Sequence, residues 1–465
     1  MSCASRKCHG GPGYASPAEA LKGPKETILF VTAPHAKDGH DAIFSIDVDQ
    51  SSENFCKVVS RVDLPNIGDE VHHTGWNACS SCHTDSTAKR SNLIVPCLNS
   101  DRVYILNVED PKNIYLQKTI EPSELHNKNV SFPHTSHCLA DGNIMISTLG
   151  TANGDAQGSF LLIDGTSFEV KDTWSNQTTK FNYDFWYQPR HNIMISTEWG
   201  TPNLIKQGFN PQHVGEGSYG NTVHLFEWDS HKLLQSIDLP LPSGALPLEV
   251  RFLHEPSKAN AFVGCALGSS IYHIHPGKEG EYVANLAAEI PSRAVSGWAL
   301  ENMPALITDI LISMDDKYLY VSCWLHGDIR QYDISDPSNI RLTGQVFIGG
   351  SLHKNSGVTV LDDASIPEPL VVKNRQISGG PQMLQLSLDC RRLYVTTSLY
   401  KQWDSQFYPN LLDSGACMVR VDIDEDGKMS VNPDFLVDFG KIENGPYLAH
   451  EMRYPGGDST SDIWI

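Results

Sequence analysis

The chain repeats one pattern of polar and apolar positions along its length. In most copies a polar residue opens a short apolar stretch, a turn residue follows seven positions later, and a second apolar run comes next. The first copy is weaker, and the last is followed by the end of the given sequence. Asp309 and Asp316, followed by the run 318–321, show the pattern most plainly. Apolar stretches on both sides of a tight polar turn predict two antiparallel strands joined as a hairpin. The copies begin near residues 73, 134, 184, 249, 309, 382 and 451.

The spacing of these copies predicts a β-propeller. Successive gaps of 61, 50, 65, 60, 73 and 69 residues suit one four-stranded sheet per repeat. Further strands are predicted at 26–32, 41–47, 159–165, 222–228 and 328–334. We therefore predict an all-β, seven-bladed β-propeller over residues 26–465, after an N-terminal arm over residues 1–25. A sandwich of unrelated hairpins is the alternative, and the recurrence of one polar strand position disfavours it.

A propeller must close so that no sheet edge stays open. Residues 461–465 are strand-like and lie at the end of the sequence. The N-terminal strands are expected either to complete the sheet of the last blade or to form the outer part of the first. Residues 355–373 are expected to form a surface insertion.

Radial repeats direct the same position of every unit toward one axis, which predicts a polar axial channel. Several residues at this position are potential metal ligands. Because the last, first and second copies are neighbours in a closed ring, their histidines would meet on one side of the axis. The predicted metal ligands are His72, His73, His134, His137 and His450.

Strand geometry limits which of these histidines can share one site. Adjacent residues of a strand face opposite sides, so His72 and His73 both reach the site only if a bulge or turn interrupts the strand. The same holds for His134 and His137, which lie three positions apart. Several neutral imidazoles suit copper, zinc, iron or nickel, with a redox metal for oxidation and zinc for hydrolysis. The alternative is a solvated channel whose polar residues bind only water.

The remaining axial positions are mostly acidic. They are expected to order water near the metal, to pair with Arg251 and Arg453, or to bind a hard cation such as calcium. This set consists of Asp184, Glu249, Asp309 and Gln382.

The composition limits the classes of partner that the protein can bind. The net charge of −20 argues against nucleic acids and anionic membranes, which attract basic surfaces. No stretch approaches 18 apolar residues, and the N-terminus lacks an apolar signal core. We therefore expect a cytoplasmic protein, with nuclear entry left open, and no transmembrane segment. Nucleotide-binding glycine motifs and a serine-hydrolase elbow are also missing from the sequence.

The 11 cysteines are expected to be mostly thiols. Cys79 and Cys82 have the spacing of a redox dithiol or of a thiol relay beside a metal, and without a second pair a four-cysteine zinc site is disfavoured. Two ordinary loop thiols are the alternative. Lys57 next to Cys56 would favour a thiolate only if both side chains face the same way.

Long segments of the chain resemble the selenium-binding protein family, which includes methanethiol oxidases. The similarity runs nearly from end to end. It includes the string His-His-Thr-Gly-Trp-Asn at 72–77 and Cys-Ser-Ser-Cys at 79–82. The other matching segments are 8–14, 134–138, 184–192, 324–328 and 450–458.

This resemblance implies an oxidase that converts methanethiol, water and O₂ into formaldehyde, hydrogen sulfide and hydrogen peroxide. It also implies copper held by histidines, and association of selenium with Cys56. Combined with the predicted axial site, it makes Glu451 and Asp309 the candidates for proton transfer or for orienting ligands, with Cys79 and Cys82 as redox helpers. Two alternatives are a non-enzymatic propeller that carries selenium or soft metals and offers its loops to protein partners, and a zinc hydrolase.

Overall fold

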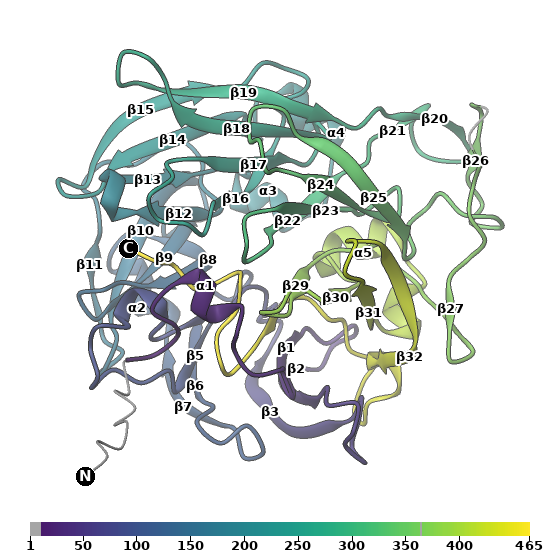
Figure 1. Cartoon of the computed structure of the whole chain (residues 1–465), viewed down its shortest axis with the longest axis horizontal. Coiled ribbons are helices and arrows are strands. Elements are labelled where there is room, and N and C mark those ends of the chain that lie inside the picture. Colours follow the sequence, from purple (N-terminus) through teal and green to yellow (C-terminus); the bar gives the residue numbers. More distant parts are fainter. Residues whose placement is uncertain (1–10, 363–364) are drawn as a thin grey trace, which may run out of the picture.

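The computed structural model describes residues 11–362 and 365–465, and the chain there is built mainly of β-strands (Figure 1). Within these ranges the strands form seven four-stranded sheets, one three-stranded sheet and one two-stranded sheet. Figure 1 shows the sheets arranged around a common centre. This all-β architecture is consistent with the predicted propeller.

Each four-stranded sheet is antiparallel. One contains β1 (Ile28–Ala33), β2 (His40–Asp47), β3 (Val58–Ile67) and β33 (Met452–Arg453). The next contains β4 (Gly75–Trp76), β5 (Asn92–Pro96), β6 (Val103–Asn107) and β7 (Tyr115–Ile120). The third contains β8 (Ser131–Cys138), β9 (Asn143–Gly150), β10 (Ala156–Asp164) and β11 (Val170–Thr173). The fourth contains β12 (Phe185–Gln188), β13 (Ile193–Ser196), β14 (Thr222–Glu227) and β15 (Lys232–Asp238).

Three further four-stranded sheets follow in chain order. The fifth contains β16 (Pro247–Phe252), β17 (Ala261–Cys265), β18 (Ser270–Pro276) and β19 (Tyr282–Glu289). The sixth contains β22 (Ile307–Ile312), β23 (Tyr318–Cys323), β24 (Asp328–Asp333) and β25 (Arg341–Phe347). The seventh contains β29 (Leu384–Leu386), β30 (Arg392–Thr396), β31 (Cys417–Ile423) and β32 (Met429–Asp438).

The smaller elements lie between these sheets. The small sheets contain β20 (Arg293–Ser296), β21 (Asn302–Met303) and β26 (Thr359–Val360), and β27 (Val371–Val372) with β28 (Arg375–Gln376). The predicted insertion at 355–373 thus supplies β26 and β27. The α-helices are α1 (Pro17–Ala20), α2 (Pro122–His126), α3 (Pro202–Ile205), α4 (Pro211–Gly215), α5 (Lys401–Phe407) and α6 (Leu411–Ser414). The 3₁₀ helices are η1 (Ser80–Cys82), η2 (Pro189–His191) and η3 (Phe439–Lys441).

The strand that opens each sequence repeat lies at one edge of its sheet, on the side that faces the other sheets. These edge strands contact one another in series: β12 with β16, β16 with β22, β22 with β29, and β29 with β33. Strand β4 likewise contacts β8. The polar residue that begins each repeat is therefore carried into the interior.

The N-terminal strands complete the sheet of the last repeat, which is the first of the two predicted arrangements. Strand β33 pairs antiparallel with β1, with Val31 opposite Met452 and Phe30 opposite Arg453. Strands from the two ends of the sequence therefore share one sheet, and β1 to β3 complete the sheet that β33 begins.

The predicted strand at 461–465 is wrong. This segment is irregular and mostly buried. The Asp462 carboxylate accepts hydrogen bonds from the backbone N–H groups of Ser80 and Asp458, which holds the chain in turns. The Trp464 indole N–H donates to the Tyr14 carbonyl oxygen at 2.9 Å, so the terminal segment lies against the arm.

Apolar side chains fill the space between adjacent sheets. One buried cluster joins Phe160, Trp186, Phe226 and Tyr272 across the third, fourth and fifth sheets. From Gly11 onward the predicted arm is packed against this body, since Ala20 shares a buried cluster with Trp464. Among the helices of the described ranges, none is both long and apolar enough to span a bilayer.

Candidate metal centre

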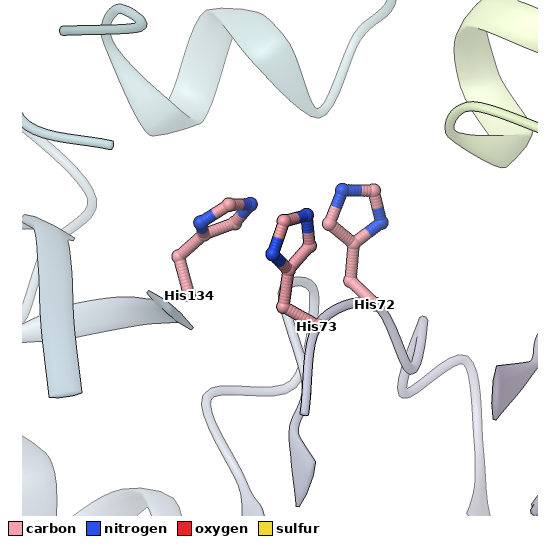
Figure 2. Close-up of side chains that lie close together, drawn as sticks. All are labelled: His72, His73 and His134. Atoms are coloured by element: carbon pink, nitrogen blue, oxygen red, sulfur yellow. The ribbon is translucent and has the colours of Figure 1, made fainter. Parts of the chain in front are cut away.

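Four histidines from three parts of the chain gather in the interior. His72, His73 and His134 each offer a ring nitrogen within 4.8 Å of the others, and all three side chains are buried. Figure 2 shows their rings side by side, with His72 and His73 carried by one loop. The His450 ring stacks on His72, with centroids 3.6 Å apart and planes inclined by 23°. We refer to these four residues as the histidine cluster.

Irregular backbone allows both adjacent histidines to reach this cluster. Val71 forms an isolated bridge to Cys97, and regular pairing resumes only at β4, so residues 72–74 lie outside any strand. The predicted interruption of the strand at His72 and His73 is therefore present.

His137 does not join the cluster. The register of β8 shifts between Pro133 and Ser136, and His137 lies against Phe185 and Trp186, with ring centroids 5.1 Å from each. Both of its ring nitrogens lack a hydrogen-bond partner in the described structure. As a ligand of a shared metal it stays a prediction without geometric support.

The ring nitrogens of the cluster are poorly satisfied by the protein. His450 Nδ1 lies 3.0 Å from the Ser398 carbonyl oxygen. Because a carbonyl only accepts, Nδ1 carries the hydrogen and Nε2 presents a lone pair. Within the described residues, Nε2 of His73, His134 and His450 and both nitrogens of His72 have no hydrogen-bond partner. Each buried unsatisfied group costs about 1–3 kcal/mol, which favours a ligand among these rings.

Burial also keeps the imidazoles neutral, the form that binds a metal. Loss of hydration lowers the pKa of His134 and of His450 to about 3. Burial, followed by repulsion from the neighbouring rings, lowers the pKa of His72 and of His73 well below the usual value. The four rings offer nitrogen donors without charge, which fits copper or zinc.

Glu451 holds one side of the cluster. Its Oε1 lies 3.6 Å from His73 Nδ1 and accepts a hydrogen bond from Arg453 Nη2 at 2.6 Å. Its Oε2 accepts hydrogen bonds from the backbone N–H and hydroxyl of Thr74. Burial raises the pKa of Glu451 to about 7, against the opposing effect of Arg453. A carboxylate behind an imidazole can orient the ring, and the role of Glu451 in orientation or proton transfer stays a prediction.

Asp309 belongs to a different group, centred on Arg251. The guanidinium lies 2.6 Å from Asp184 Oδ2, 2.8 Å from Glu249 Oε2 and 3.7 Å from Asp309 Oδ1. The predicted pairing of the axial acids with Arg251 is therefore confirmed. Burial raises the pKa of Asp309 to about 7. Calcium at these acids stays a prediction, as does proton transfer by Asp309.

The cysteines lie in two other places. Cys79 and Cys82 are buried together with Cys138. Cys56 is half-buried in the turn between β2 and β3, with a φ of 63°, and lines a cavity of about 400 Å³. Burial raises the pKa of the Cys56 thiol, and the cations that oppose this are Lys373 and Arg420, whereas the Lys57 amine donates to the Glu53 carbonyl oxygen. All nine cysteines in the part of the chain that the structure describes are free; Cys3 and Cys8 lie outside it.

Three contacts in these sites could not be predicted from the sequence. The Tyr183 ring lies 4.0 Å from the His134 ring, and the Ser398 carbonyl orients His450. The third is the approach of Cys138 to Cys82 described below. The aromatic run 183–187 predicts only an apolar wall, and a backbone carbonyl leaves no signal in a sequence.

Comparison with known proteins shows the family of the chain. The family model described as "56kDa selenium binding protein (SBP56)" matches residues 8–465. The chain belongs to the 56 kDa selenium-binding protein family. The resemblance noted in the sequence is thereby confirmed.

Relatives within the 56 kDa selenium-binding protein family are similar over the whole length. A methanethiol oxidase of Rattus norvegicus is 52% identical and selenium-binding protein 2 of Mus musculus is 52% identical, each with 100% of both chains covered. The X-ray structure of a hypothetical selenium-binding protein from Sulfolobus tokodaii superposes with a TM-score of 0.87 at 35% identity. It covers 97% of this chain and 98% of its own. The fold is thus shared within the family.

Proposed function

We propose that this chain is a copper-dependent methanethiol oxidase. The reaction consumes methanethiol, O₂ and water and yields formaldehyde, hydrogen sulfide and hydrogen peroxide. Relatives more than 50% identical over the full length carry the name methanethiol oxidase. The observation that carries the proposal is the histidine cluster, because its unpaired Nε2 atoms form a site that a propeller does not need for stability.

His72, His73, His134 and His450 would hold the copper. Copper supplies one-electron chemistry with O₂ and lowers the pKa of a coordinated thiol. The protein contributes a water-poor site of neutral rings, each of them buried. The hydrogen bond from His450 Nδ1 to Ser398 fixes the tautomer that leaves Nε2 free.

Glu451 is the residue best placed to hold a proton beside the cluster. Its pKa of about 7 lets the carboxyl exist in both protonation states near neutral pH. Oε1 faces His73 Nδ1, so the carboxylate orients this ring and receives a proton from its side of the site. Arg453 and Thr74 keep the carboxyl in place during this exchange.

Other assignments complete the proposal. The seven four-stranded sheets are the seven blades of one ring. Selenium associates with Cys56, whose sulfur lies beside a cavity. The free thiols support a reducing, cytoplasmic setting, with entry into the nucleus left open. Protein partners would bind through the loops.

The test measures copper content and methanethiol-dependent release of sulfide and peroxide in the same samples. His134→Ala is expected to lose both bound copper and activity. The matched control is His273→Gln, which changes another buried histidine, one whose Nε2 pairs with Asn260. Full activity in His134→Ala would refute the site. A wild-type protein that binds copper without turnover would instead favour the alternative of a metal or selenium carrier.

A further inference from the structure

Three cysteine sulfurs surround a single hydroxyl group beneath the first 3₁₀ helix. Ser81 Oγ lies 3.2 Å from Cys79 Sγ, 3.8 Å from Cys82 Sγ and 3.7 Å from Cys138 Sγ. The three side chains are buried in one small cluster with Ala78. Sequence spacing predicts only the pair Cys79 and Cys82, whereas the fold adds a third thiol.

The third thiol comes from a distant strand. Cys82 ends η1, and Cys138 is the last residue of β8. The Cys82 backbone N–H donates to the Cys79 carbonyl, which closes the turn between these two residues. The Cys82 thiol donates a hydrogen bond of 3.4 Å to the carbonyl oxygen of Leu139, the residue after Cys138. Cys82 is thus directed toward the end of β8.

The three thiols differ in access. Cys82 lines a cavity of about 450 Å³ whose wall includes Asn77, Asp85 and Asp141, and neither Cys79 nor Cys138 lines it. Side-chain exposure is 6% for Cys82, 1% for Cys79 and 2% for Cys138. A small reagent that enters this cavity meets Cys82 first.

Their ionisation differs as well. The hydrogen bond from the Cys138 thiol, with a further one from Ser81, lowers the pKa of Cys82 to about 6 despite its burial. Burial, with further contributions from its hydrogen bonds to Cys79 and Cys82, raises the pKa of Cys138 well above its usual value. Cys82, which lines the cavity, is therefore the thiol of the pair that ionises more readily, and Cys138 lies behind it as the group that can react with its oxidised form.

We propose that Cys82 and Cys138 form a peroxide-reactive thiol pair at this cavity. The Cys82 sulfur attacks one oxygen of hydrogen peroxide, the O–O bond breaks, and Cys82 becomes a sulfenic acid as hydroxide leaves. The Cys138 sulfur then attacks the Cys82 sulfur, the S–O bond breaks, and water leaves with the Cys138 proton. The two thiols lose two electrons to form a disulfide, and the peroxide is reduced to water.

This reaction needs neither copper nor methanethiol, so it does not rest on the proposed oxidase activity. It goes beyond the predicted dithiol because its resolving thiol is Cys138 and not Cys79. An enzyme that released peroxide would expose this pair to its own product.

The experiment treats reduced, chelator-washed full-length protein with stoichiometric hydrogen peroxide. Intact mass and peptide mapping then identify the sulfur chemistry, with dimedone added to trap sulfenic acid. The wild type is expected to lose two hydrogens and to yield a Cys82–Cys138 cross-linked peptide that a reductant cleaves. Cys138→Ser is expected to lose the cross-link and to accumulate dimedone on Cys82, and Cys82→Ser to lose both products.

Cys390→Ser is the matched control, because Cys390 is more exposed but burial raises its pKa to about 12. This variant is expected to form the Cys82–Cys138 bond at the wild-type rate. A Cys79–Cys82 bond, dimedone on another cysteine of the wild type, or a cross-link that persists in Cys138→Ser would each overturn the proposal.

Discussion

Removing His134 should make the metal-free protein less sensitive to acid. The pKa of this imidazole is about 3 in the folded protein because of burial, and about 6.5 in an unfolded chain. Between these values the unfolded state binds one more proton than the folded state, so the stability that a neutral His134 permits is lost as pH falls. The loss is about 1.4 kcal/mol per pH unit and per imidazole.

The expected magnitude follows from this slope. From about pH 7 to about pH 5, the wild type loses about 2 kcal/mol that His134→Gln does not lose. Buried acids act in the opposite direction, because Glu451 and Asp309, with pKa values of about 7, bind protons in the folded state more readily than in the unfolded state. Since both proteins contain these acids, their contribution cancels in the difference.

The assay is urea unfolding of chelator-treated wild type and His134→Gln at these two pH values. The double variant His134→Gln/His450→Gln tests additivity, because His450 has the same low pKa. Its expected difference from the wild type is about 4 kcal/mol. An identical pH dependence of wild type and His134→Gln would refute the argument, because the imidazole would then titrate alike in both states.

Three further outcomes follow from the same geometry. Removal of copper by a chelator should abolish methanethiol-dependent peroxide release, and copper should restore it where calcium does not; activity that survives complete removal would exclude a copper role. Glu451→Gln should lower kcat at least tenfold, about 1.4 kcal/mol, and flatten the pH profile of activity near neutrality, whereas an unchanged profile would remove Glu451 from proton exchange. Arg90→Met should lower the free energy of unfolding by about 3–5 kcal/mol, because the buried Asp462 carboxylate loses the guanidinium that lies 2.5 Å away. Urea unfolding measures this change, and a loss below about 1 kcal/mol would contradict the argument.

Much of the fold could be predicted because each copy of the repeat specifies a local hairpin, and the spacing of the copies specifies one sheet per repeat. Apolar stretches on both sides of a polar turn recur along the chain, so the hairpin of β22 and β23 could be predicted from this pattern. The same argument shows that His72 and His73 need an interrupted strand to meet. The prediction for the final segment was wrong because Ile463, Trp464 and Ile465 are residue types that favour strands. The carboxylates of Asp458 and Asp462 instead bind the backbone there in turns.

Residues of the histidine cluster could be predicted only where they lie at or beside the shared polar position of the repeat. His134 and His450 do, and they meet His72 as neighbouring repeats require. His137 lies beyond a register shift in β8 and packs against Phe185 and Trp186 instead. The meeting of Cys82 and Cys138 could not be predicted, because it depends on how a loop packs under a distant strand.

The pairing of β33 with β1 also sets an order of events during synthesis. The ribosome releases a chain from its N-terminus, so His72, His73 and His134 emerge long before His450 and β33. Until then the sheet of β1 keeps an open edge, and three of the four imidazoles lack their last neighbour. The proposed metal is therefore expected to enter only after His450 has emerged, and a nascent chain stalled before His450 should bind copper weakly.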